Sequence, residues 1–155
     1  MKLVDFLGHH MKSDDVVDLL EGFDMRVIYQ FDRTHENLAD YYDAAAKADG
    51  FELRFDEHQV LTTVFCYVKP RGDIAAVDID FIGVPLLESF ADARAYALSN
   101  GIKISEPPPA SDHFEQWIRL EHDERWDHYQ FSDGQLARVT MFLPKAGLRT
   151  RRSGS

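Results

Sequence analysis

The sequence has little of what marks several protein classes. With one cysteine among 155 residues, no disulfide can form within the chain, and a reducing compartment is expected. No apolar run approaches the ~20 residues of a membrane-spanning helix, and the acidic N-terminus does not resemble a signal peptide. Hydrophobic residues make up 45% and charged residues 28%, near the globular average, which argues against disorder and coiled coil. We therefore expect a soluble, cytoplasmic protein without a membrane partner.

Basic residues are also scarce. The chain has 27 Asp and Glu against 17 Lys and Arg, which gives a formal net charge of −10. Four of the basic residues follow Pro144 and no acidic residue does, so residues 1–144 carry a formal net charge of −14. Such a body repels phosphate backbones, and no direct contact with nucleic acid is expected. An excess of acidic residues can simply keep a protein soluble, or it can complement the charge of a basic partner. The composition leaves both interpretations open.

The length fits one domain, and we expect a single α+β domain over residues 1–144. Residues 145–155 predict a disordered basic tail, whose Ser-Gly-Ser ending is typical of an added sequence. No internal repeat of 20–50 residues is found, although a strand-rich stretch follows helical residues in both halves.

Three helices are expected from capping residues and composition. Ser13 predicts the start of a helix that ends near Gly22. The Ala-rich segment 36–50 has no proline and predicts a second helix. Ser89 opens a pattern that resembles a capping box, and the helix that follows is expected to end at Gly101.

Alternating and β-branched residues predict six strands between and after these helices. They cover residues 51–55, 60–68, 74–84, 114–121, 126–131 and 135–143. Residues 25–31 form either a strand or an extended connector. Short turns join neighbouring strands, so we expect antiparallel hairpins and a C-terminal three-stranded meander, with two to three helices packed on one side.

The turn at residues 132–134 decides which face of this meander is core. A three-residue loop aligns Tyr129 and Phe131 with Ala137, Val139 and Met141, whereas a two-residue Asp-Gly turn shifts the register by one. We favour the three-residue loop, because it gathers the apolar set on one side. The residues expected to face outward are then Trp117, Arg119, Trp126, Arg138 and Phe142. Trp and Arg are enriched in protein-binding hot spots, which makes this outward set a candidate binding surface. The alternative is that a loop, or the proline-rich segment 105–112 (SEPPPASD), covers it.

Motifs that mark catalytic, cofactor or metal sites are largely absent from the sequence. No glycine-rich phosphate loop, nucleophile elbow or zinc-protease motif is present, so no catalytic residue, cofactor or metal is expected. Segment 121–128 (EHDERWDH) has metal-ligand residue types, but it spans a hairpin turn and splays its side chains to both faces. Cys66 lies among apolar residues, which predicts a buried, unreactive thiol. Asp78 and Asp80 share one face of an expected strand, where proximity can raise a carboxyl pKa or where both are simply exposed.

Three segments of the chain, in this order, carry a family resemblance. They are GFELRFDEHQVLTTVFCYV at 50–68, GVPLLESFADARAYA at 83–97 and WIRLEHDERWDHYQFSDGQLARVTMFLP at 117–144. They resemble small bacterial immunity proteins encoded beside polymorphic toxins of type VI secretion and contact-dependent inhibition systems. The resemblance covers residues 50–144 and contains no catalytic motif. It implies a protein that binds and inactivates a toxin delivered by sibling cells.

Two hypotheses follow. The first is a non-enzymatic monomer or weak dimer that occludes a cognate protein toxin, such as a nuclease with a basic active-site cleft. The alternative is a small enzyme or ligand-binding domain with a pocket between helix and sheet near Asp78, Asp80 and His113. The residues expected to contact the partner are Asp73, Asp78, Asp80, Trp117, Arg119, Glu121, Asp123, Glu124, Trp126, Asp127 and His128.

Overall fold

The computed structural model describes residues 1–31, 39–107 and 115–145. The strands are β1 (Val27–Gln30), β2 (Tyr41–Ala46), β3 (Phe51–Phe55), β4 (Leu61–Tyr67), β5 (Lys103–Ser105), β6 (Glu115–Glu121), β7 (Trp126–Ser132) and β8 (Gln135–Phe142). The helices are α1 (Asp14–Gly22) and α2 (Phe90–Ser99), with 3-10 turns η1 (Leu3–Phe6), η2 (Lys47–Asp49) and η3 (Ile79–Phe81). The predicted tail lies outside the described residues from 146 onward.

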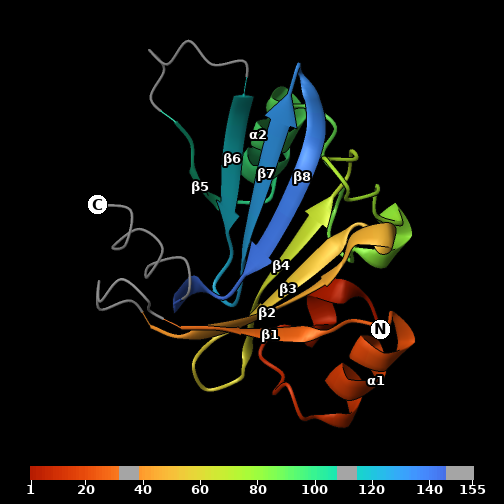
Figure 1. The fold of residues 1–155 in the computed structure, drawn as a ribbon. Coiled ribbons are helices and arrows are strands. Elements are labelled where there is room, and N and C mark those ends of the chain that lie inside the picture. The colour runs from red at the N-terminus through yellow and green to blue at the C-terminus, as the bar shows by residue number, and fades with distance from the viewer. Residues whose placement is uncertain (32–38, 108–114, 146–155) are drawn as a thin grey trace.

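All eight strands form one open antiparallel sheet in the order β1-β2-β3-β4-β8-β7-β6-β5 (Figure 1). The α+β class is therefore confirmed. The C-terminal strands belong to this larger sheet, with β5 as a further neighbour of β6, and they do not form a separate three-stranded unit. Strands β1–β4 are consecutive neighbours, as are β5–β8, and the two halves meet where Cys66 of β4 lies opposite Val139 of β8. Each half begins with an α-helix, so the same order of elements occurs twice.

One face of the sheet, called here the covered face, packs against both helices. The helix starts predicted at Ser13 and Ser89 are confirmed, and the Ser89 hydroxyl accepts a hydrogen bond from the Asp92 amide at 3.1 Å. The Tyr129 hydroxyl donates to the Pro85 carbonyl at 2.8 Å, which ties the segment before α2 to the sheet. The core that joins helices and strands includes Val16, Leu19, Phe51, Leu53, Val64, Cys66, Ala93, Ala97, Tyr129, Val139 and Met141.

The helix predicted over residues 36–50 is wrong. Residues 41–46 form β2, which pairs with both β1 and β3, and η2 follows. Ala44 and Ala46 are buried opposite Leu53 and Phe51 of β3. Pairing on both edges and burial of every second residue override the weak helix preference of alanine. Residues 36–38 of the predicted helix lie outside the described residues.

The strand predicted over residues 74–84 is also wrong, because both edges of β3 are already paired. The segment instead crosses the start of β3, where the Val77 amide donates to the Tyr67 carbonyl at 2.7 Å. Gly50, with a φ of 77°, permits this crossing, because a Cβ there would lie 2.3 Å from the Val77 nitrogen. Residues 79–81 then form η3, so Asp78 and Asp80 do not share a strand face.

The turn between β7 and β8 differs from the favoured three-residue loop. Ser132 pairs with Gln135, so the turn has two residues, Asp133 and Gly134, both with positive φ. A bulge next to Phe131 then makes Ala137 an extra residue in β8. Beyond the bulge Tyr129 pairs with Val139, so both side chains lie on the same face of the sheet. The expected outward set is therefore correct, but Leu136 takes the core position that was assigned to Ala137.

Candidate functional site

The second face of the sheet, called here the open face, carries no helix in the part of the chain that the structure describes. Strand alternation and register assign its side chains. They include Ile28, Gln30, Tyr41, Asp43, Ala45, Glu52, Arg54, Thr63, Phe65, Tyr67, Lys103, Ser105, Trp117, Arg119, Glu121, Trp126, His128, Gln130, Arg138, Thr140 and Phe142. Aromatic rings and guanidinium groups alternate across this face, which is the composition typical of protein-binding hot spots.

A cluster of aromatic rings and one arginine lies at the end of the open face near the β6–β7 turn. The Arg119 guanidinium carbon lies 4.5 Å from the centre of the Trp126 ring, within cation–π range. The Trp126 ring in turn meets Phe142 edge-on, with 6.0 Å between ring centres. Arg119 Nε donates to the Glu121 carboxylate at 3.2 Å, which holds the guanidinium in place. The ring of Trp126 is therefore held in one orientation by its neighbours.

Next along β7, His128 stacks on Trp117 with 5.1 Å between ring centres and an interplanar angle of 21°. Burial, together with the nearby positive charge of Arg138, lowers the pKa of His128 to about 4. The imidazole is therefore neutral near pH 7. This part of the open face presents flat rings without an added positive charge.

The N-terminal half of the open face repeats the same chemistry. The Arg54 guanidinium lies 4.5 Å from the Tyr41 ring centre and 5.4 Å from that of Phe65, and its Nε donates to Asp43 at 3.1 Å. Arg138 lies on the other side of Phe65, at 5.9 Å from its ring centre. Aromatic–arginine contacts therefore extend from β2 to β6 across the seam between the halves.

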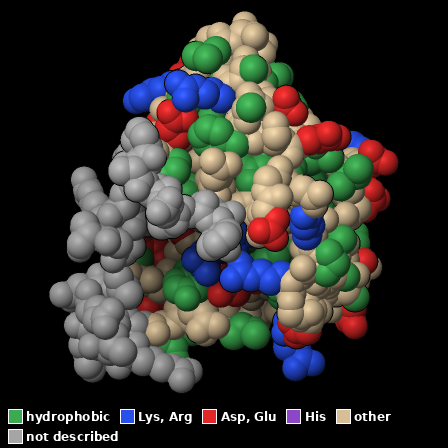
Figure 2. All heavy atoms as spheres, turned by 90° about the horizontal axis from the view of Figure 1, so that it is seen from above, with side chains coloured by type: hydrophobic (Ala, Val, Ile, Leu, Met, Phe, Trp, Pro, Cys, Tyr) green, Lys and Arg blue, Asp and Glu red, His purple; other side chains and the backbone are tan. Residues whose placement is uncertain are grey.

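The open face is nearly balanced in charge, unlike the chain as a whole. Among the described side chains of its strands, four cations (Arg54, Lys103, Arg119 and Arg138) stand against three acids (Asp43, Glu52 and Glu121). Viewed from above, basic, acidic and hydrophobic side chains are intermixed on the molecule (Figure 2). The expected combination of acidic and aromatic character on one surface is therefore not what the sheet presents, and the excess of acid lies elsewhere.

Five of the predicted partner-binding residues come together on the open face, namely Trp117, Arg119, Glu121, Trp126 and His128. Of these, Arg119 is buried, with 9% of its surface exposed, and so is the side chain of Glu121. Asp123 and Glu124 are exposed in the turn beside them. Asp127 contradicts the expectation of an exposed acid, since it is buried on the covered face with 1% of its surface exposed. Alternation along β7 places it opposite to Trp126 and His128, and its carboxylate accepts hydrogen bonds from Arg125 at 2.7 and 3.2 Å.

The three remaining acids lie in the segment that crosses β3. Asp73 forms an exposed ion pair with Lys47 of η2 at 2.9 Å. Asp78 caps η3, with its Oδ1 accepting from the Asp80 amide at 3.0 Å. The structure does not bring Asp78 to the open face, because its neighbours Phe23 and Phe51 belong to the helix-covered side.

Sequence reasoning missed the N-terminal half of the open face. Tyr41 lies in the segment that is predicted to be a helix. Outward-facing aromatic residues are predicted only for the last three strands. A signal was nevertheless present, because Arg54 and Phe65 occupy the polar-side positions of two strands that were correctly predicted. Alternation applied to the 51–55 and 60–68 segments would have placed both on the face opposite to Leu53 and Val64.

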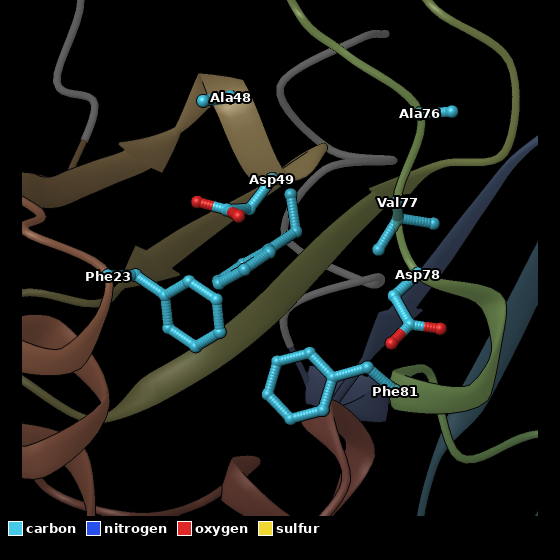
Figure 3. A pocket seen from close by; sticks show the side chains of 8 residues that line it. Phe23, Ala48, Asp49, Ala76, Val77, Asp78 and Phe81 are labelled. Carbon is cyan, nitrogen blue, oxygen red and sulfur yellow. The ribbon is translucent and has the colours of Figure 1, made fainter.

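A separate hollow of about 480 Å³ lies between the C-terminal end of α1 and the crossing segment (Figure 3). Its aromatic part consists of Phe23, Phe51 and Phe81, whose ring centres are 5.0 to 5.9 Å apart. Asp49 and Asp78 lie on opposite sides of it (Figure 3). Of the pocket expected near Asp78, Asp80 and His113, only Asp78 lines this hollow, and His113 lies outside the described residues.

Metal-binding and thiol chemistry find little support in the arrangement of side chains. Among residues 1–31, 39–107 and 115–145, no three His, Cys, Asp or Glu side chains converge as a metal site would require. In segment 121–128, His122 Nε2 faces Asp127 at 3.3 Å, but His128 points to the other side of the sheet. The predicted burial of Cys66 is confirmed, and burial raises the pKa of its thiol to about 12.

Known proteins offer no guide to this geometry. Comparison with protein-family models, with curated proteins and with solved structures finds no match to the chain. Among the described residues, no helix is long and apolar enough to cross a membrane. Function must therefore be argued from the open face and the hollow.

Proposed function

We propose that this protein is a non-catalytic immunity protein that binds and occludes a cognate secreted toxin through its open face. The observation that carries the proposal is the cluster of Arg119, Trp126 and Phe142 on a sheet face to which neither helix packs. The resemblance of residues 50–144 to immunity proteins of polymorphic toxin systems supports a secreted toxin as the class of partner.

The open face suits tight binding because it is ordered before the partner arrives. The cluster lies on paired strands, and Glu121 holds Arg119 over the Trp126 ring. Rigid side chains lose little conformational entropy on association, so more of the interaction energy remains as affinity. Trp and Arg anchors of this kind commonly dominate the binding energy of an interface.

The acidic charge of the molecule has a separate role in this proposal. The charges on the open face are nearly balanced, whereas residues 1–144 carry a net charge of −14. An acidic molecule accelerates the encounter with a basic partner, such as a nuclease with a positively charged cleft. Asp123 and Glu124, exposed beside the aromatic cluster, would then border the contact. In this arrangement the aromatic cluster sets the dissociation rate and the surrounding acids set the association rate.

The experiment measures binding kinetics with the toxin encoded next to this protein's gene. Trp126→Ala should raise the dissociation rate roughly 30-fold, which corresponds to about 2 kcal/mol for the loss of a central anchor. Leu98→Ala is the matched control, because Leu98 is an exposed hydrophobic side chain on α2, which packs on the covered face. Equal binding by both variants and the parent would show that the open face is not the interface.

Stoichiometry separates occlusion from catalysis. An occluding protein protects cells, or a toxin substrate in solution, only up to one equivalent of toxin. Titration of toxin activity should therefore end at a fixed molar ratio. Protection by far less than one equivalent would show turnover and would reject the non-catalytic mechanism, whatever the result for Trp126.

A further inference from the structure

The hollow beside α1 combines an apolar aromatic surface with negative charge. Phe23 and Phe81 are stacked, with 5.5 Å between ring centres and an interplanar angle of 27°, and Phe51 meets both rings edge-on. The carboxylates of Asp49 and Asp78 flank these rings (Figure 3). A cavity of about 480 Å³ lies within the range of small-molecule sites. Its lining therefore combines an aromatic surface with two carboxylates.

The walls of the hollow are held in place before any ligand binds. The Ala75 amide donates to the Lys47 carbonyl at 2.8 Å, so the crossing segment is fixed to η2. Close approach over Gly50 fixes Val77 against the start of β3. Asp78 caps η3 and thereby sets the position of Phe81. A cavity built from such contacts requires little reorganisation on binding.

The charges of the hollow have no internal counterion among the described residues. Neither Asp49 nor Asp78 forms an ion pair, and Lys47, the cationic residue nearest in sequence to Asp49, is paired with Asp73. Asp24 and Asp80 are next in sequence to two of the phenylalanines. Lys2 reaches this region, but its Nζ donates to the Asp80 backbone carbonyl at 2.5 Å and forms no ion pair with Asp49 or Asp78. Phe51 is fully buried, so a cation entering the hollow would meet both carboxylates and the partly exposed rings of Phe23 and Phe81.

We propose that this hollow is a binding site for an organic cation, with Asp49 and Asp78 neutralising its charge and the rings of Phe23 and Phe81 contacting its alkyl part. The chemical class is an alkylammonium group. It can belong to a free amine or to a lysine side chain of another protein, and both sources share the recognition chemistry. The site lies on the helix-covered side, so it stands independently of binding at the open face.

The test is a titration of the full chain followed by amide chemical shifts. Choline is the free cation, and 3,3-dimethyl-1-butanol is its neutral counterpart of the same shape. Choline should shift the amides of Phe23, Asp49, Val77 and Phe81 and bind about fivefold or more tightly than the neutral alcohol. Equal affinity for the two, or shifts confined to other regions, would overturn the proposal.

Variants separate charge from shape. Asp49→Asn with Asp78→Asn removes both charges, and the amide oxygen at position 78 can still cap η3. This double variant should lose about fivefold or more in affinity for choline. Asp133→Asn is the control, since it removes a charge in the β7–β8 turn at a position with positive φ that asparagine tolerates. Unchanged choline affinity in a folded double variant would overturn the proposal.

A peptide arm identifies the source of the cation. Acetyl-Gly-Lys-Gly-amide is compared with the same peptide carrying norleucine in place of lysine. Tighter binding of the lysine peptide than of choline supports a protein side chain as the natural ligand, and the reverse order supports a free amine. If the lysine and norleucine peptides bind alike and choline binds no better than its alcohol, the hollow is not a cation site.

Discussion

The two faces of the sheet are made by alternate residues of the same strands, yet they are built on different principles. The covered face buries Phe51, Leu53 and Val64 completely beneath helices. On the open face their neighbours Arg54 and Phe65 remain partly exposed and contact one another through cation–π geometry. One face therefore holds the fold together, whereas the other can hold a surface in a fixed shape for binding.

The two faces should differ most in how much the loss of one ring lowers the free energy of unfolding. Phe51→Ala removes a fully buried ring that contacts Phe23 and Phe81, and it should lower the free energy of unfolding by about 3–5 kcal/mol. Phe65→Ala, made one strand away on the open face, should cost less than half as much, because the ring is only half-buried. Urea denaturation of both variants measures the difference. Equal losses would mean that the open face is as much a core as the covered one.

A second prediction concerns His128, the buried imidazole on the open face. Its pKa is lowered to about 4 by burial, whereas an unfolded histidine titrates near 6.5. The unfolded chain therefore binds the proton more readily, and the free energy of unfolding should fall as pH drops from about 6.5 towards 4, by up to about 3 kcal/mol.

His128→Phe keeps a ring against Trp117 and removes the titration, so its stability should depend less on pH over this range. His58→Gln, at an exposed histidine, controls for the loss of a histidine in general. Denaturation curves between pH 4 and 7 compare the variants with the parent. If His128→Phe and the parent lose the same stability over this range, another group causes the loss.

The acidic charges at the edge of the open face should have a smaller effect, on the rate of association with the toxin. Reversing Asp123 and Glu124 to Lys should slow association with a basic toxin several-fold at low salt and leave the dissociation rate nearly unchanged. The difference should shrink at physiological ionic strength, where the Debye length is about 8 Å. Stopped-flow measurements at two salt concentrations provide the comparison. A change in dissociation alone would instead place these two residues inside the contact.

Much of this two-faced arrangement could be predicted from the sequence, because alternation is a local property. The 51–55 and 60–68 strands, the starts of two helices and the outward set from Trp117 to Phe142 follow from spacing and capping. The outward set was correct although the turn was not, since the bulge at Ala137 compensates for the shorter loop. Binding by this set stays a prediction.

The errors arise where distant parts of the chain decide the outcome. Residues 41–46 contain helix-favouring alanines, but β1 and β3 pair with them on both sides. Residues 74–84 look like a strand, but no edge of β3 or β4 is left for them. Asp127 belongs by sequence to an acidic hairpin tip, but its side chain points to the covered face, where it is buried and accepts hydrogen bonds from Arg125. Local patterns cannot contain this information.

The pairing of β4 with β8 has a consequence for synthesis on the ribosome. Strand β4 ends at Tyr67, but its second neighbour is complete only at Phe142. At translation rates of roughly 5–20 residues per second, about 4–15 s pass before the central ladder can close. During this interval the nascent chain displays an unpaired strand edge that includes Val64 and Cys66, a site at which strands of other chains can add. The central position of the last strand thus makes the newly synthesised half-protein a natural client for chaperones.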